Sequence, residues 1–120
     1  MEEMKKDKLM IVMRTDLDMG TGKMIAQAGH AITNLLFTNI DYGSSITEWI
    51  ATGMKKVCVA ASNEAQLLHA VAKAQELDIP VYLIRDEGLT QVDPGTATCC
   101  AIGPEKDKLI EKVTGSLPLL

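Results

Sequence analysis

The sequence has few aromatic residues, no excess of basic residues and no long apolar run. Phe, Trp and Tyr make up 3% of the 120 residues, which argues against extensive stacking of nucleic-acid bases. The formal net charge is −4, so the surface is not coated in basic charge, and any contact with nucleic acid would need a local patch. No apolar run reaches the roughly 20 residues of a transmembrane helix, so we expect no membrane span.

The three cysteines do not suggest a disulfide framework. Their number is odd, and residues 1–8 alternate acids and lysines without the apolar core of a secretion signal. We therefore expect Cys58, Cys99 and Cys100 to be small buried apolar residues of a cytoplasmic protein. The two histidines are far apart and no Cys-x-x-Cys pair occurs, so the sequence predicts no zinc site.

The length of the chain fits a single domain, residues 1–120, with its own core and with residues 1–7 flexible. Strands alternate with helices, which predicts a layered α/β fold. Helical crossovers should make the first three strands parallel, whereas the fourth follows without a helix and should be antiparallel. The predicted strands are residues 9–15, 56–61, 81–85 and 97–102; the predicted helices are 22–39, 45 to 50 or 51, 62 or 63 to 77, and 105–113.

The first strand, the turn after it and the next helix are the most informative stretch. The turn contains Gly20, Gly22 and then Lys23. At 100° per residue, Lys23, Gln27, His30 and Asn34 form one narrow polar stripe on the helix. The apolar residues on the opposite side are expected to face the core; they are Met24, Ile25, Ala28, Ile32, Leu35 and Leu36.

Lys23 is out of place at the start of a helix. Unpaired backbone N–H groups make that end electropositive, which favours acidic side chains over lysine. A residue that violates a local preference without visible compensation is a candidate for function, and the glycine turn before it suits a phosphate. The alternative, that Lys23 is a solvated surface lysine, stays open.

A second group of polar residues follows the third predicted strand. This segment supplies Arg85, Asp86, Thr90 and Gln91, and a turn at 93–96 is expected to fold it back. α/β folds place ligands at the carboxyl ends of parallel strands, so this loop and the glycine turn should open at the same edge of the sheet. An ordinary polar loop, with Asp86 capping backbone N–H groups, is the alternative.

Together these segments resemble the signature of the type 2 peptidyl-tRNA hydrolases. The resemblance runs from about residue 8 to residue 120, in order and without large gaps. The motifs that carry it are Arg14-Thr15-Asp16-Leu17-Asp18-Met19-Gly20-Thr21-Gly22-Lys23, Ala26-Gln27, His30-Ala31, Ile84-Arg85-Asp86, Gly88, Thr90-Gln91, Pro94-Gly95-Thr96, Ile102-Gly103-Pro104 and Lys112-Val113-Thr114-Gly115.

The resemblance implies a three-layer α/β/α fold with a four-stranded mixed sheet and helices on both faces. It also implies hydrolysis of the ester between a nascent peptide and the 3′-terminal ribose of tRNA, without a metal or another cofactor. Its proposed catalytic residues match Lys23, Asp86 and Thr90. Gln27, His30 and Gln91 match positions that line the same cleft, and the predicted substrate-binding residues also include Arg14, Gly20, Gly22 and Arg85.

The sequence lacks a Gly-x-Ser-x-Gly motif for a nucleophilic serine, so we expect water to attack the ester directly. In this hypothesis Asp86 orients or deprotonates the water, and Thr90 holds the water or the reacting carbonyl. Lys23 stabilises the developing negative charge or a nearby phosphate. His30, about 10 Å further along the helix axis, contacts tRNA, supports the site from behind or is a structural histidine.

The expected partner is peptidyl-tRNA, held by a basic patch if Lys23, Arg14, Arg85, Lys55 and Lys56 share one edge. Compared with the family pattern, Glu87 adds a carboxylate and Leu89 replaces an arginine beside the site. The alternative function is therefore a non-catalytic adaptor of the same fold that binds RNA or a protein. The sequence fits either a monomer or a homodimer.

Overall fold

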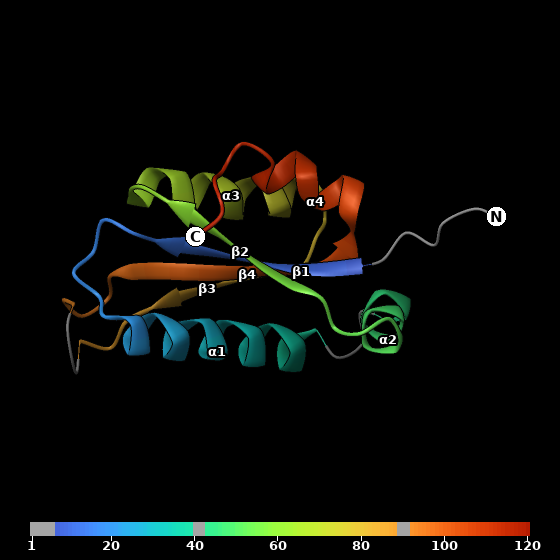
Figure 1. Ribbon diagram of the computed structural model, residues 1–120, viewed down its shortest axis with the longest axis horizontal. Coiled ribbons are helices and arrows are strands. Elements are labelled where there is room, and N and C mark those ends of the chain that lie inside the picture. The colour runs from blue at the N-terminus through green and yellow to red at the C-terminus, as the bar shows by residue number, and fades with distance from the viewer. Residues whose placement is uncertain (1–6, 40–42, 89–91) are drawn as a thin grey trace.

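A computed structural model of the chain describes residues 7–39, 43–88 and 92–120, without the side chain of Ser44. Four strands form one mixed sheet between two layers of helices, which confirms the predicted three-layer α/β/α fold (Figure 1). The elements are β1 (Asp7–Arg14), α1 (Thr21–Thr38), α2 (Ser44–Ala51), β2 (Lys56–Ala61), α3 (Glu64–Glu76), β3 (Val81–Arg85), β4 (Ala97–Lys106) and α4 (Asp107–Thr114).

The bounds of β2 and β3 match the predicted ones, and the N-cap of α3 is Asn63, whose side chain accepts a hydrogen bond from the backbone N–H of Gln66. The segment predicted to be flexible included residue 7. Asp7 is buried as the first residue of β1, whereas residues 1–6 lie outside the described part of the chain.

The sheet has the order β2-β1-β4-β3. β1 and β2 are parallel, and β4 runs antiparallel to both β1 and β3, so the first three strands share one direction, as predicted. β4 therefore lies between β1 and β3. The carboxyl ends of these two strands still open at one edge of the sheet, where α1 begins (Figure 1).

Each face of the sheet carries its own core. Trp49 of α2 and Leu35 of α1 pack on one face, and residues of α3 and α4, such as Leu67 and Ile110, pack on the other. Neighbouring side chains of a strand point to opposite faces, so Cys99 belongs to the first core and Cys100 to the second.

Burial raises the pKa of the Cys99 thiol to about 12 and also raises that of Cys100, because a thiolate is poorly solvated in these cores. The prediction of buried apolar cysteines is thus confirmed for these two residues. Cys58 of β2 is only half-buried, so the prediction was too strong for that residue.

Most of the apolar face predicted for α1 does pack against the core: Leu35 is buried, and Met24, Ala28, Ile32 and Leu36 are partly buried against it. The exception is Ile25, which is 68% exposed, and the buried residues of the helix also include Gln27 and Ala31. The helix is rotated so that the edge of the polar stripe faces the sheet. This rotation is possible because the Gln27 amide finds hydrogen-bond partners in the interior, which removes the penalty of burying it.

β4 also extends further than predicted. The strand passes through Gly103 and Pro104 to Lys106, and its register with β1 shifts between Lys8 and Met10. Such a bulge accommodates an extra residue and a proline without an N–H group, and the φ of +103° at Gly103 is one that glycine adopts readily. The Gly-Pro pair therefore does not start the last helix.

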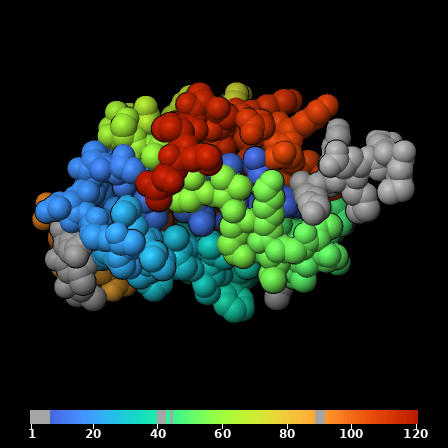
Figure 2. Space-filling view, viewed as in Figure 1, coloured from blue at the N-terminus to red at the C-terminus, as the bar shows by residue number. Residues whose placement is uncertain are grey.

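The two outer edges of the sheet differ. The C-terminal segment covers the edge of β2: the N–H of Ala60 donates to the carbonyl of Pro118 (2.8 Å), and that of Leu120 donates to the carbonyl of Cys58 (3.1 Å). Figure 2 shows this segment, in red, lying against the green β2. The outer edge of β3 has no strand beside it in the described part of the chain.

Candidate active site

Lys23 and Asp86 meet at the carboxyl ends of β1 and β3. The Lys23 Nζ lies 2.5 Å from the Asp86 Oδ1. Lys23 is the third residue of α1, which follows the N-cap Gly20, and Asp86 comes directly after β3. The two loops singled out in the sequence therefore converge on one ion pair between residues 63 positions apart.

Asp86 is firmly held. Its Oδ1 also accepts a hydrogen bond from the Gln27 Nε2 (3.2 Å), and its Oδ2 accepts one from the Gly88 backbone N–H (2.6 Å). The Asp86 side chain is 3% exposed, compared with 12% for Lys23. The hydrogen bond from Lys23 is the main reason that the pKa of Asp86 lies below its ordinary value, and the Gly88 N–H adds to this effect.

The loop after β3 folds back on Asp86, as predicted. The Asp86 N–H donates to the Thr96 carbonyl (2.8 Å), and the Asp86 carbonyl accepts from the Gly95 N–H (2.7 Å). Gly88 has a φ of +79°, and a Cβ added there would lie 2.4 Å from Pro94 Cγ. Glycine is therefore required at residue 88, and its position aims its N–H at the carboxylate.

Thr98 is a site residue that the sequence analysis missed. It lies on β4, fully buried, and its hydroxyl donates to the Gln27 Oε1 (2.7 Å). Because an ionised carboxylate only accepts hydrogen bonds, the Gln27 Nε2 must face Asp86, and the hydroxyl of Thr98 complements this orientation. The available signal was a single hydroxyl residue within the otherwise apolar start of β4.

A groove of about 990 Å³ opens beside the ion pair. Lys23, His30 and Asn34 of α1 line one side of it, and Tyr82 and Leu83 of β3 line the other. His30 is exposed. Its carbonyl accepts a hydrogen bond from the Asn34 Nδ2 (2.8 Å), whereas its ring makes no hydrogen bond within the part of the chain that the structure describes. The stripe of α1 thus forms one wall of the groove.

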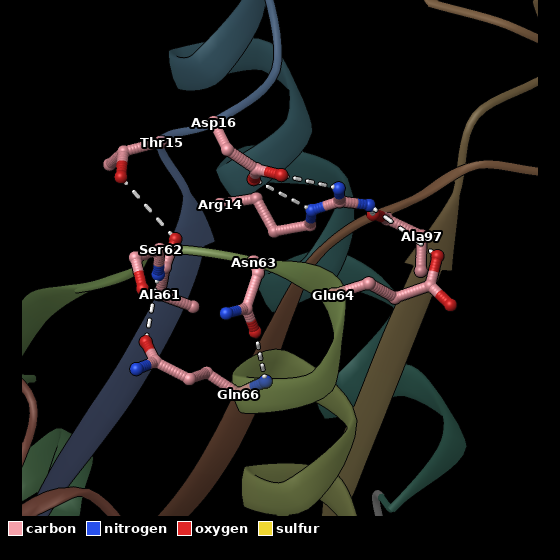
Figure 3. A network of polar contacts seen from close by, with 9 residues as sticks. All are labelled: Arg14, Thr15, Asp16, Ala61, Ser62, Asn63, Glu64, Gln66 and Ala97. Atoms are coloured by element: carbon pink, nitrogen blue, oxygen red, sulfur yellow. Dashed lines mark hydrogen bonds and ion pairs between the residues drawn. The ribbon is translucent and has the colours of Figure 1, made fainter.

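Arg14 lies at the same edge but is bound within the protein (Figure 3). Its guanidinium donates to both carboxylate oxygens of Asp16 (3.0 and 2.7 Å) and to the Ala97 carbonyl (3.0 Å), and it lies 3.5 Å from Glu64. The pKa of Arg14 is raised, chiefly by the hydrogen bond to Asp16. A substrate phosphate would have to displace one of these partners.

The other predicted basic residues do not all share this edge. Arg85 is exposed there, with one nitrogen donating to the Gly95 carbonyl (3.1 Å). Lys56 pairs in register with Leu9, five positions before Arg14, so it lies about 16 Å away at the other end of the sheet. The expectation of a single patch that includes Lys55 and Lys56 is therefore wrong.

Within residues 7–39, 43–88 and 92–120, no group of three His, Cys, Asp or Glu side chains is placed to hold a metal ion. None of the helices in the same ranges is both long and apolar enough to cross a membrane.

Comparison with known proteins gives the family. The family described as Peptidyl-tRNA hydrolase PTH2 matches residues 7–120. The chain belongs to this family.

Archaeal proteins named peptidyl-tRNA hydrolase are similar to the chain over nearly its whole length. A protein named peptidyl-tRNA hydrolase from Methanocaldococcus jannaschii is 46% identical over 94% of this chain and 99% of its own length. Proteins of the same name from Thermococcus onnurineus and Methanopyrus kandleri are 44% and 41% identical, each over 94% of this chain and 97% of its own length.

A solved structure supports the fold assigned to this PTH2 chain. It is a protein of unknown function from Agrobacterium tumefaciens strain C58, with a TM-score of 0.66 and 14% sequence identity. The match covers 98% of this chain and 99% of that one. At this identity the likeness concerns the fold alone.

The resemblance also named Thr90 and Gln91, which lie outside the described residues. Gly20 and Gly22 are exposed at the start of α1, directly before Lys23. The described part of the candidate site therefore consists of the Lys23–Asp86 pair, the supporting Gln27 and Thr98, and the groove.

Proposed function

We propose that this protein hydrolyses the ester of peptidyl-tRNA, releasing tRNA and a free peptide. The observation that carries this proposal is the Lys23–Asp86 ion pair at the end of a 990 Å³ groove, in a chain of the PTH2 family. Water adds to the ester carbonyl carbon, the bond from that carbon to the ribose oxygen breaks, and the proton that the water gives up passes to the ribose oxygen.

Lys23 supplies the positive charge in this reaction. Its side chain is the more exposed member of the pair and lines the groove, so a carbonyl oxygen in the groove can approach it. A fixed ammonium beside the developing oxyanion lowers the barrier, and one such electrostatic donor changes kcat by roughly 10²–10³-fold. Asp86 fixes the position of this ammonium by a direct hydrogen bond.

Asp86 orients the attacking water rather than deprotonating it. The carboxylate already accepts three hydrogen bonds, and its lowered pKa makes it a weak base. A carboxylate has about four lone-pair sites, which leaves room for one water. Thr90 and Gln91 follow in the same loop, and we assign to Thr90 the second contact with this water and to Gln91 a contact with the substrate.

The tRNA end of the substrate lies beside the exposed start of α1. Gly20 and Gly22 let a phosphate or ribose approach the backbone N–H groups, and Arg85 is exposed at the same edge. His30 contributes to the wall of the groove and Arg14 holds the edge together through its internal partners. A cytoplasmic location, a part in ribosome rescue, and a monomeric or homodimeric state remain predictions.

Turnover of a purified N-acetyl-aminoacyl-tRNA tests the proposal. We expect hydrolysis by the wild-type protein and a fall of at least about 100-fold in kcat for Lys23→Ala, with Asp86→Ala also impaired. Lys73→Ala is the matched control, because Lys73 lies on α3, on the opposite face of the sheet, and pairs only weakly with Glu76 (3.9 Å). Near wild-type turnover in both site variants would contradict the mechanism, and tRNA binding without turnover in the wild type would support the adaptor.

A further inference from the structure

The groove continues well beyond the ion pair. On α1 it runs from Lys23 to Asn34, which is about 16 Å along the helix axis, and on β3 it reaches back from Asp86 to Tyr82, about 13 Å along the strand. The reaction itself needs only the end at Lys23 and Asp86. The remaining length is available to hold part of the substrate.

One wall of this extension is the open edge of β3. The Pro80 carbonyl accepts a hydrogen bond from the Gly103 N–H, so Pro80 faces β4. Backbone groups of an antiparallel strand face its partner at every second residue, and the N–H and C=O groups of Val81 and Leu83 therefore face away from β4. No strand in the described part of the chain pairs with them.

Leu83 borders the groove with its backbone. Its side chain packs against the core on the α3 and α4 side of the sheet, whereas the groove lies on the α1 side. The part of Leu83 that can line the groove is thus the outer edge of the strand. This edge offers a hydrogen-bond donor and an acceptor side by side.

Charge separates the two ends of the groove. Lys23, Arg85, Asp86 and Glu87 all lie at the end where the strands finish. The far end, around Asn34 and Tyr82, is lined by neutral side chains. At the charged end Lys23 and Arg85 are the groups that can attract a phosphate, whereas an uncharged chain rich in amides suits the far end.

We propose that the peptide part of the substrate binds as an added strand along the outer edge of β3. This inference rests on the proposed hydrolysis, because the acyl carbon must lie at Lys23 and Asp86. The peptide is attached through its C-terminal carbonyl, and β3 also ends at Asp86, so the peptide runs parallel to β3. In a parallel pair, the N–H and C=O of Leu83 both bond to the added strand.

This mode of binding fits a substrate of variable sequence. Strand addition uses main-chain hydrogen bonds, which every peptide offers whatever its side chains. At about 3.3 Å per residue, the 13 Å of β3 holds about four residues. We therefore expect kcat/KM to rise with peptide length up to about four residues, by about tenfold over an N-acetyl-aminoacyl-tRNA, and then to level off.

Leu83→Pro tests the role of the edge. Proline removes the outward N–H and blocks the edge, but it takes no hydrogen bond from the pairing with β4. Leu83→Ala is the matched control, because it loses the packing of the side chain and keeps the N–H. We expect the tenfold preference for a tetrapeptidyl-tRNA to fall to about one in Leu83→Pro and to persist in Leu83→Ala.

Backbone N-methylation of the substrate tests the same contact in the wild-type protein, independently of how the variants fold. Methylation of single amides in a tetrapeptidyl-tRNA should lower kcat/KM at alternate residues only. Equal effects at every residue, or no dependence on peptide length, would overturn the proposal. If Leu83→Pro, but not Leu83→Ala, lowers kcat/KM equally for both substrates, the groove binds the RNA part of the substrate and the proposal is wrong. Failure of the proposed function would give a different result from failure of this proposal, because the wild-type protein would then hydrolyse neither substrate.

Discussion

At the residue scale, the surroundings of two buried carboxylates shift their pKa values in opposite directions. Asp86 is lined by donors, and the hydrogen bond from Lys23 is the main cause that lowers its pKa. Asp7 lies beside Lys106 (3.1 Å), yet burial dominates and raises its pKa. Burial alone therefore does not set the direction in which the pKa of an acid moves; the hydrogen-bond donors and charges around the carboxylate act against it.

The lowered pKa of Asp86 predicts how its contribution to stability depends on pH. A folded pKa below the unfolded value of 3.8 gives a stabilisation that is complete above that value and is lost as the pH falls through the folded pKa. The difference in free energy of unfolding between the wild type and Asp86→Asn should thus be constant from pH 7 to 5 and shrink below about pH 4. Urea denaturation over this pH series measures it.

Asp7→Asn is the control with the opposite sign. The raised pKa of Asp7 means that its contribution is complete below the unfolded value of 3.8 and is lost as the pH rises through the folded pKa. The stability of Asp7→Asn relative to the wild type should therefore improve as the pH increases from 3 to 7. The same trend with pH in both variants would contradict these assignments.

Thr98 is expected to matter through the Gln27 side chain that it orients. Thr98→Val keeps the shape but leaves the buried Gln27 Oε1 without its donor, which destabilises the fold by about 1–3 kcal/mol. The amide then loses its fixed orientation toward Asp86, and we expect kcat to fall about tenfold, or about 1.4 kcal/mol, with little change in KM. Thr98→Ser keeps the hydroxyl and should restore kcat; an equally slow Thr98→Ser would contradict this role.

At the element scale, local patterns predicted β2 and β3 well because both strands have a clear start and end. β2 and β3 are short runs rich in β-branched residues, preceded by a glycine turn or a proline, and their bounds are as predicted. The end of β4 was wrong, because the bulge that carries the strand through Gly103 depends on its pairing with β1. Such pairing is not encoded within the segment itself.

The rotation of α1 shows a second limit of sequence reasoning. The convergence of Lys23 and Asp86 followed from the order of strands and helices, so this part of the site was predictable. The burial of Gln27 was not, because its partner Thr98 lies 71 positions away. An apolar periodicity cannot show that a distant hydroxyl will make a buried amide favourable.

The start of α1 offers a test of the proposed tRNA contact. A Cβ added at Gly22 or at Gly29 meets nothing within 4 Å, so either can become alanine without a clash. Both variants should be as stable as the wild type or more so, by up to about 1 kcal/mol, because alanine favours helix. Only Gly22→Ala should lower kcat/KM, by roughly tenfold, since an added methyl group blocks the approach to the backbone N–H groups.

If Gly22→Ala and Gly29→Ala are equally active, the start of α1 does not contact the substrate. Gly29 is the appropriate control because it lies on the exposed side of the same helix, two turns further on.

At the scale of the whole molecule, few cations are available to bind RNA. The net charge is −4, Lys23 and Arg14 already bond to carboxylates at the site edge, and Lys56 lies at the far end of the sheet. Affinity for nucleic acid falls with salt by about 0.7–0.9 log units per phosphate contact for each tenfold rise in salt. We expect log(kcat/KM) to fall with log salt with a slope no steeper than about −3.

Measurements at 50–300 mM KCl, at substrate concentrations well below KM, give this slope. Arg85→Gln should flatten it by about one, whereas Lys56→Gln should leave it unchanged. A slope as steep as −6 would mean that basic residues beyond this edge contact the tRNA.

The thiols of Cys99 and Cys100 on β4 allow the unfolding of each helical layer to be followed separately. In chains that retain only Cys99 or only Cys100, a pulse of alkylating reagent during urea unfolding reports when water first enters one layer or the other, since each thiol lies in a different core. Because one strand separates and supports both layers, we expect the two labelling rates to coincide. If the Cys99 chain labels sooner, the layer that carries α1 opens independently, and Lys23 belongs to the less stable half of the molecule.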